Sequence, residues 1–240
     1  MSVLKIGRNG FIWLLVLWIL SAPAAIAQPL FAVVGDYGDG STDEGAVSAL
    51  VYGWNPDLVI TTGDNRYGTL DYDETVGQFY CDSLADAGSG NFCAGGNSFS
   101  NVFFPSLGNH DYFEGGGLNE YLDYFNLPGT GIDTSGTSGN ERYYDFVRGS
   151  VHFFVIDSEG ALNNSSDRTA QMNLLQAQLA ASSTPWQIVY FHHPAYSSST
   201  ISSHSSMQWP FASWGADAVI TGHHHTYERI FADGIPYFIN

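Results

Sequence analysis

Short runs of β-branched and aromatic residues recur along the chain and alternate with segments in which apolar residues recur at helical spacing. Such alternation is typical of an α/β domain. The apolar runs predict strands over residues 31–34, 58–62, 102–107, 142–147, 151–156, 187–191, 218–221 and 236–239.

Helical spacing predicts helices over residues 43–53 and 118–125. We expect the clearest helix to begin after Asp167, a good N-cap residue, with Met172, Leu175 and Leu179 along one face. Segments rich in Gly and Ser are interpreted as surface loops, over residues 86–100, 129–140 and 197–206.

Residues 1–27 are typical of a secretory signal peptide. Basic residues precede an apolar run over residues 11–20, and small residues at positions 25 and 27 provide a cleavage pattern before Gln28. The other interpretation is an uncleaved membrane anchor, but the apolar run is short for a spanning helix. We therefore expect a secreted or periplasmic chain with one domain over residues 28–240.

Without this leader the chain is more acidic still. The formal net charge is −17, and removal of Lys5 and Arg8 leaves five arginines against 24 carboxylates. Such a surface repels nucleic acid and anionic membranes, so we expect no nucleic-acid partner and no stable membrane association after cleavage. An anionic substrate would need a local positive charge that these scattered arginines do not supply. The sequence does not indicate an oligomeric state.

The two cysteines, Cys81 and Cys93, lie in a stretch rich in Gly, Ser and Asn. In an oxidising compartment we expect them to form a disulfide. Metal ligation is the alternative, but two thiols without a nearby histidine make a poor metal site.

Polar side chains follow five predicted strands directly, in FAVVGDYG, LVITTGDNRY, VFFPSLGNHD, QIVYFHHP and AVITGHHH. Each is weak evidence alone, because Gly-Asp and Gly-Asn are ordinary turn dipeptides. Ligands of α/β sheets bind beyond the carboxyl ends of the strands, so these five ends are expected to converge. The resulting set suits iron, zinc or manganese and is too rich in nitrogen for calcium, and it comprises Asp36, Asp64, Asn109, His192, His223 and His225.

Together these segments resemble the signature blocks of the purple acid phosphatases, a group within the calcineurin-like metallophosphoesterases. The family blocks DxG, GDxxY, GNH[DE], VxxH and GHxH correspond, in this order, to residues 36–38, 63–67, 108–111, 189–192 and 222–225. Tyr67 separates this group from the wider superfamily, which lacks a tyrosine ligand there. The resemblance implies an α/β fold of two packed mixed β-sheets flanked by helices, a four-layer α/β/β/α sandwich.

The resemblance also implies two metal ions. Carried over by position, Asp36, Tyr67 and His225 bind the first ion, Asp64 bridges, and Asn109, His192 and His223 bind the second. It implies Fe(III) at the Tyr67 site and Fe(II), Zn(II) or Mn(II) at the second, with a colour from phenolate-to-iron charge transfer. A hard anionic phenolate suits a trivalent ion.

Further roles follow from family position. His110 is the candidate general acid, Asp111 is expected to orient its ring, and His204 resembles a second histidine outside the metal ligands. The alternative for His204 is an exposed loop residue. His193 and His224 are interpreted as bystanders, and His224 as a solvated residue or one behind the ligands.

Other residues near the blocks are interpreted as structural. Tyr37 is expected either to pack beside the site or to touch substrate. Arg66 is interpreted as a solvated turn residue, and Glu228 and Arg229 as an ion pair.

The function that the resemblance implies is hydrolysis of small phosphate monoesters through attack of a metal-bound hydroxide. Alternatives are a phosphodiesterase or nucleotidase on the same centre, or an inactive metal- or phosphate-binding fragment. We expect the compact form of the family, without a separate N-terminal β-domain. Members usually continue past a segment such as IPYFIN, so a chain truncated at its C-terminus is one interpretation.

Overall fold

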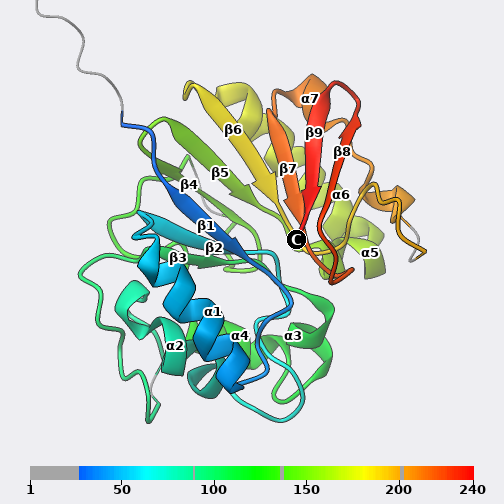
Figure 1. Ribbon diagram of the computed structural model, residues 1–240. Helices are drawn as coiled ribbons and strands as arrows, with labels where there is room; N and C mark the ends of the chain where they lie inside the picture. Colours follow the sequence, from blue (N-terminus) through cyan, green and yellow to red (C-terminus); the bar gives the residue numbers. More distant parts are fainter. Residues whose placement is uncertain (1–26, 89, 136–137, 201–202) are drawn as a thin grey trace, which may run out of the picture.

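The computed structural model describes residues 27–88, 90–135, 138–200 and 203–240. Two β-sheets lie face to face, and helices cover the outer face of each sheet (Figure 1). The expected four-layer α/β/β/α arrangement is confirmed. The expected signal peptide lies outside the described residues, apart from Ala27.

The first sheet has three parallel strands in the order β1-β2-β3, formed by Phe31–Val34, Leu58–Thr61 and Phe103–Pro105. Helices follow these strands on the outer face, namely α1 (Thr42–Gly53), the π-helical turn η1 (Asp73–Gly77), α2 (Gln78–Tyr80), the 3₁₀ turn η2 (Cys81–Ser83), α3 (Asn109–Phe113) and α4 (Leu118–Tyr124). Ser41 caps α1, because its side chain accepts hydrogen bonds from the amides of Asp43 and Glu44.

The second sheet is mixed and runs in the order β4-β5-β6-β7-β9-β8. The strands are β4 (Tyr144–Arg148), β5 (Val151–Val155), β6 (Trp186–Tyr190), β7 (Ala218–Thr221), β8 (Glu228–Ala232) and β9 (Ile235–Ile239). β4 and β8 pair antiparallel at the two edges, whereas the four central strands are parallel. The outer helices are α5 (Ser158–Asn163), α6 (Ser165–Ala181), the 3₁₀ turn η3 (Ser205–Met207) and α7 (Phe211–Trp214).

Successive residues of β5 explain the layering. Phe153 and Val155 belong to the core between the two sheets, whereas Phe154 and the following Ile156 pack toward α6 and α7. A strand buried on both faces therefore reads as a continuous apolar run, as the sequence pattern does here. Full burial of each such side chain contributes about 1.5–3 kcal/mol.

Several expected element boundaries differ from the structure, and β3 ends at Pro105 rather than at residue 107. Asn164, not Asp167, caps α6, because the Asn164 carboxamide accepts from the amides of Ser166 and Asp167. Asp167 lies inside the first turn and accepts from Arg142 at 2.6 Å. Strand β4 begins two residues later than expected, at Tyr144.

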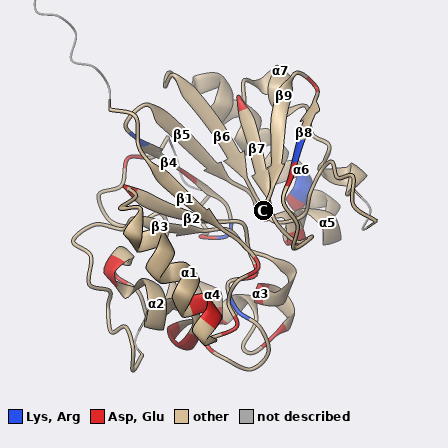
Figure 2. Cartoon of the chain, viewed as in Figure 1, with Lys and Arg blue, Asp and Glu red and all other residues tan. Residues whose placement is uncertain are grey.

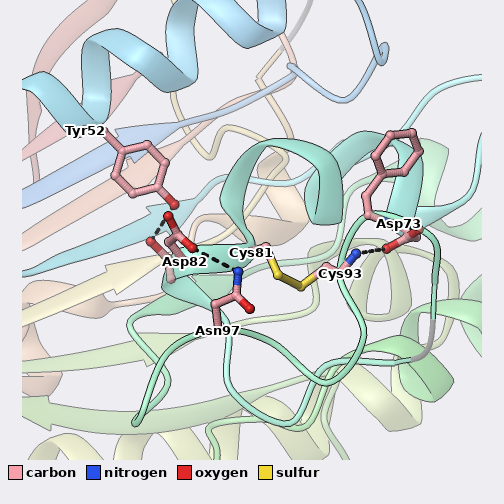
Figure 3. The surroundings of a disulfide bond; sticks show 8 residues. Tyr52, Asp73, Cys81, Asp82, Cys93 and Asn97 are labelled. Carbon is pink, nitrogen blue, oxygen red and sulfur yellow. Dashed lines mark hydrogen bonds between the residues drawn. A yellow bond between two sulfur atoms is a disulfide. The ribbon is translucent and has the colours of Figure 1, made fainter.

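Cys81 and Cys93 form the expected disulfide (Figure 3). It joins η2 to the Gly/Ser-rich loop that leads to β3. The Asp73 carboxylate accepts from the amides of Phe92 and Cys93, and this holds the loop beside η1. Among the described helices, none combines the length and apolarity that crossing a bilayer requires.

Candidate metal centre

Five strand ends from the two sheets deliver polar side chains to one place. Asp36, Asp64 and Asn109 follow the three strands of the first sheet, whereas the histidines follow β6 and β7. In Figure 1 the strands β6 and β7 run toward the centre of the molecule, where β1 and β2 also end. The two sheets thus converge at the carboxyl ends of their parallel strands, as expected for an α/β site.

Four candidate ligands adopt left-handed backbone conformations. The φ angles are 54° at Asp36, 52° at Asp64, 73° at His223 and 49° at His225. Such angles are uncommon outside glycine, although Asp, Asn and His tolerate them best. The chain turns sharply just after each strand, so each side chain is aimed across the strand ends rather than along them. Local strain of this kind concentrates at functional sites.

Gly63 and Gly108 let these turns approach one another. A Cβ atom on Gly108 would lie 2.1 Å from Asp64 Oδ1, and one on Gly63 would lie 2.7 Å from His192 Nδ1. Any larger residue at either position would push the β2 and β3 ends apart. The glycines of the two blocks are therefore required by packing as well as by turn geometry.

Asp36, Asp64, Tyr67 and His225 form one set of donors. His225 Nε2 lies 3.3 Å from Asp36 Oδ1, and Tyr67 Oη lies 3.4 Å from both Asp64 Oδ2 and His225 Nε2. The carboxylates are buried, whereas the His225 side chain is 63% exposed. This set therefore opens to solvent on the histidine side.

Asp64, Asn109, His192 and His223 form the adjoining set. His192 Nε2 lies 3.0 Å from Asn109 Oδ1, 3.1 Å from His223 Nδ1 and 3.3 Å from Asp64 Oδ2. His192 Nδ1 donates to the Thr62 carbonyl at 2.7 Å, which turns Nε2 toward the other donors. Asp64 belongs to both sets. All seven candidate ligands are therefore brought together.

These residues fit a pair of cations. Asp36 Oδ1 is buried and accepts no hydrogen bond within the described part of the chain. A buried carboxylate oxygen without a donor is costly unless a cation compensates it. Carboxylate, amide, phenol and imidazole donors together suit iron, zinc or manganese.

The electrostatics of the cluster also favour a cation. Burial raises the pKa of Asp36 to about 6. Burial alone would lower the pKa of His192, but Asp64 and Asp36 outweigh it and raise that pKa to about 9. Burial and the same two carboxylates raise the pKa of Tyr67 well above its usual value. A bound cation would replace these protons and allow the phenol to ionise.

His110 lies at the rim of the cluster, but Asp111 does not orient it. His110 Nε2 is 3.9 Å from Asp64 Oδ2, and its ring is one-third exposed. Asp111 is fully buried and accepts from the Gly108 amide, from Asn65 and from the Tyr72 hydroxyl. Asp111 thus joins the turn after β2 to the turn after β3, and its hydrogen bonds go to these groups rather than to the His110 imidazole.

Glu114 occupies the place expected for Asp111. It follows the last residue of α3, its Oε1 lies 2.8 Å from His110 Nδ1, and its Oε2 accepts from the Gly68 amide. Glu114 was not among the residues predicted for the site. The signal was the spacing of four residues after His110, which is informative only if residues 109–113 form a helix.

The other histidines surround the second set. His193 is buried, with Nδ1 2.9 Å from Ser158 Oγ and Nε2 3.4 Å from Glu159 Oε2, and its ring centre is 4.5 Å from that of His223. His204 is partly exposed, with its ring centre 5.8 Å from that of His223. It therefore lies beside the cluster.

Of the two interpretations of His224, the structure supports a residue behind the ligands and not a solvated one. Its side chain is turned to Ser197, with Nδ1 3.0 Å from Oγ, and only 4% of the residue is exposed. Burial lowers the pKa of His224.

Arg66 was also misjudged as solvated, since it is fully buried. It pairs with Glu120 at 2.6 Å and stacks over the Tyr72 ring, so it ties the turn after β2 to α4. Tyr37 packs beside the site, where its hydroxyl donates to Asn65 Oδ1 at 3.0 Å.

The expected ion pair between Glu228 and Arg229 does not form. Glu228 accepts from Ser197 and Ser198, which lie on the loop that carries His204. Arg229 lies over the Phe238 ring instead. Adjacent residues of β8 point to opposite faces of the sheet, which separates the two side chains.

The layered fold and the shared cluster of hard donors at the strand ends define a metallophosphoesterase-type scaffold. The chain belongs to the calcineurin-like phosphoesterase family, whose model matches residues 29–227. Within this family it is similar to purple acid phosphatases. Purple acid phosphatase 15 of Arabidopsis thaliana is 28% identical over 82% of this chain and 40% of its own length. Purple acid phosphatase 23 of the same plant is 29% identical over 88% of this chain and 50% of its own length.

Solved structures agree in fold. A purple acid phosphatase from yellow lupin seeds, PPD1, superposes with a TM-score of 0.60 at 18% identity, over 87% of this chain and 43% of that chain. GAP50, described as the anchor in the inner membrane complex of Plasmodium, gives 0.62 at 17% identity, over 87% of this chain and 70% of that one. The present chain thus spans half or less of the length of these curated relatives.

Proposed function

We propose that the protein is a secreted dimetal phosphatase that hydrolyses small phosphate monoesters. The observation that supports this most directly is the arrangement of seven donor side chains in two adjoining sets that share Asp64. Fold likeness alone would not suffice, because one fold hosts many functions. The donor set is the feature that carries the chemistry.

In this proposal Asp36, Tyr67 and His225 hold Fe(III), Asp64 bridges, and the second set holds Fe(II), Zn(II) or Mn(II). Bound cations would lower the pKa of a water, orient the phosphate and offset its charge. The low content of basic residues is then no obstacle to an anionic substrate, because the centre itself is positive.

The remaining roles fall to residues around the cluster. Hydrolysis forms a bond from water oxygen to phosphorus, breaks the bond from phosphorus to the alcohol oxygen, and leaves that oxygen in need of a proton. His110, at the open rim, is placed to supply the proton, and Glu114 is the carboxylate beside its ring. His204 is our candidate for a contact with the phosphate oxygens, because it stands beside His223.

The Cys81–Cys93 disulfide supports an oxidising compartment, in line with a signal peptide over residues 1–27 and a secreted or periplasmic location. Mass spectrometry of the exported protein would test this. A mature chain that begins at Gln28 is expected, and a retained leader would contradict it.

The test of function combines metal analysis with turnover of p-nitrophenyl phosphate and its bis ester. We expect two metals per chain and faster cleavage of the monoester. Asp64→Asn should lose both metals and activity, because asparagine tolerates the left-handed backbone but lacks the bridging charge. Asp43→Asn, on the exposed side of α1, is the matched control.

The alternatives give different results. Faster cleavage of the bis ester would favour a phosphodiesterase on the same centre. Full metal loading without hydrolysis of either ester would favour a metal- or phosphate-binding protein.

A further inference from the structure

The five arginines of the described residues are spread along the chain, and each has a contact of its own (Figure 2). Arg66 pairs with Glu120, Arg142 with Asp167, Arg148 donates to the Asn101 carbonyl, Arg168 donates to the Ala161 carbonyl, and Arg229 lies over the Phe238 ring. The single lysine is Lys5. A second anionic group on a substrate would therefore meet no uncommitted guanidinium in the described part of the chain.

A cavity of about 520 Å³ opens between α3 and α5. It is lined by Tyr112 and Phe113 from α3, by Glu159 and Asn163 from α5, and by Arg142 and Asp167. The Phe113 residue is 73% exposed and lines this cavity, so its ring is accessible there. The cavity thus offers a free aromatic face next to polar groups.

Two lining residues of this cavity lie close in sequence or in space to residues around the candidate metal centre. Phe113 lies one helical turn after His110 on α3. Glu159 Oε2 lies 3.4 Å from Nε2 of His193, the neighbour of the ligand His192. An alcohol that extends from His110 along α3 would run toward Phe113 and this cavity.

The charge balance of the cavity is negative. Arg142 lies 2.6 Å from Asp167 and 3.5 Å from the buried Asp157, so two carboxylates already surround its guanidinium. Of the charged residues that line the cavity, Glu159 and Asp167 are acidic and Arg142 is basic. A cationic group is therefore favoured here and an anionic one is repelled.

We propose that the cavity is the alcohol subsite of the phosphatase and selects phosphate monoesters whose alcohol carries an ammonium group. An ammonium ion over the face of Phe113 gains a cation–π contact, and the surrounding carboxylates complement its charge. This inference rests on the proposed phosphatase function and specifies its substrate class.

The test compares two substrates of the metal-loaded enzyme, phosphocholine and 3,3-dimethylbutyl phosphate. The alcohol portion of the second has the same shape but no charge, and this substrate is called the neutral ester below. We expect kcat/KM to be about fivefold higher for phosphocholine. 3-Phosphoglycerate, which carries a carboxylate instead, should be the poorest of the three substrates. Equal or faster turnover of the neutral ester would overturn the ammonium subsite while leaving the phosphatase function intact.

Phe113→Leu should bring the ratio of kcat/KM for the two esters close to one. Phe231→Leu is the matched control, because Phe231 is 75% exposed on β8, outside this cavity. An unchanged ratio in Phe113→Leu would also overturn the subsite. No turnover of any ester by fully loaded protein, p-nitrophenyl phosphate included, would overturn the phosphatase function together with this inference.

Discussion

Tyr67 Oη and His225 Nε2 lie 3.4 Å apart, although 158 residues separate them in the sequence. The phenol is also 3.4 Å from Asp64 Oδ2. Burial, together with Asp64 and Asp36, raises the pKa of Tyr67 well above the usual value. A trivalent ion bound by this set would lower the pKa of Tyr67 instead, because it stabilises the phenolate.

Tyr67→Phe should therefore abolish the visible charge-transfer band of the iron-loaded protein. The phenyl ring keeps the shape of the side chain but cannot ligate, so the far-UV circular dichroism spectrum should not change. Tyr227→Phe, two residues after His225 and 76% exposed, is the control and should keep the band. A band that survives in Tyr67→Phe would contradict Fe(III) at this set.

Asn109→Ala should keep the colour and lose activity, because it removes a donor only from the second set. Asn109 Oδ1 lies 3.0 Å from His192 Nε2, and Asn109 is not a member of the set that contains Tyr67. We expect at least about a 100-fold fall in kcat/KM and one metal per chain by elemental analysis. Asn119→Ala, on the exposed face of α4, serves as the control. Loss of colour together with activity would mean that the two sets do not bind ions separately.

Glu114→Ala should mainly lower activity, whereas Asp111→Ala should mainly lower stability. Glu114 lies 2.8 Å from His110 Nδ1 on a partly exposed surface, so its loss should lower kcat about tenfold with little change in Tm.

Asp111→Ala should mainly destabilise the fold. It leaves the Gly108 amide, the Tyr72 hydroxyl and Asn65 without their buried acceptor, at about 1–3 kcal/mol for each unsatisfied group. Thermal unfolding beside steady-state kinetics separates the two variants. A fall in kcat at unchanged Tm for Asp111→Ala would restore it as the residue that orients His110.

The ends of the strands were predictable from the sequence, because each buried strand is an apolar run and a polar residue marks where it ends. Buried strands read as apolar runs, and a polar residue just beyond such a run can only lie at the edge of the sheet. Asp36, Asp64 and Asn109 could be placed in this way. The assignment of each donor to an ion came instead from the resemblance to a family.

Features set by distant contacts were not predictable. Asp111 faces Tyr72 rather than His110, and Arg66 is buried because Glu120, 54 residues away, neutralises it. Strand β8 was missed because its pattern, Glu-Arg-Ile-Phe-Ala, is polar and half exposed at a sheet edge. Its pairing with β9 depends on the turn at Asp233 and Gly234, which local propensity describes poorly.

The Cys81–Cys93 disulfide should stabilise the domain by restricting the unfolded chain. The cysteines are 12 residues apart, and closure of a loop of this length is worth about 3 kcal/mol in the chain-entropy model. Replacement of both cysteines by alanine should lower Tm by about 6–12 °C. Reduction of the wild-type protein should produce the same shift, and a reduced protein with unchanged Tm would show that the loop contacts of Asp73 suffice.

Glu44 should make the fold less stable as pH rises. It is 4% exposed in α1, its Oε2 accepts from the Gly40 amide at 2.7 Å, and its Oε1 has no partner among the described residues. Burial raises the pKa of this carboxyl from 4.5 to about 8.

Below pH 4.5 both the folded and the unfolded chain hold the proton, so Glu44 does not change stability there. Between pH 4.5 and about 8 the unfolded chain releases the proton while the folded chain retains it, so the free energy of unfolding falls as pH rises. Above about pH 8 the loss is complete.

Glu44→Gln keeps the shape and the acceptor for the Gly40 amide but cannot ionise. Its stability relative to wild type should therefore increase with pH across this window. Urea midpoints measured at several pH values on both proteins would reveal this as diverging curves. Parallel curves would mean that Glu44 reaches solvent and ionises in the folded state as it does in the unfolded chain.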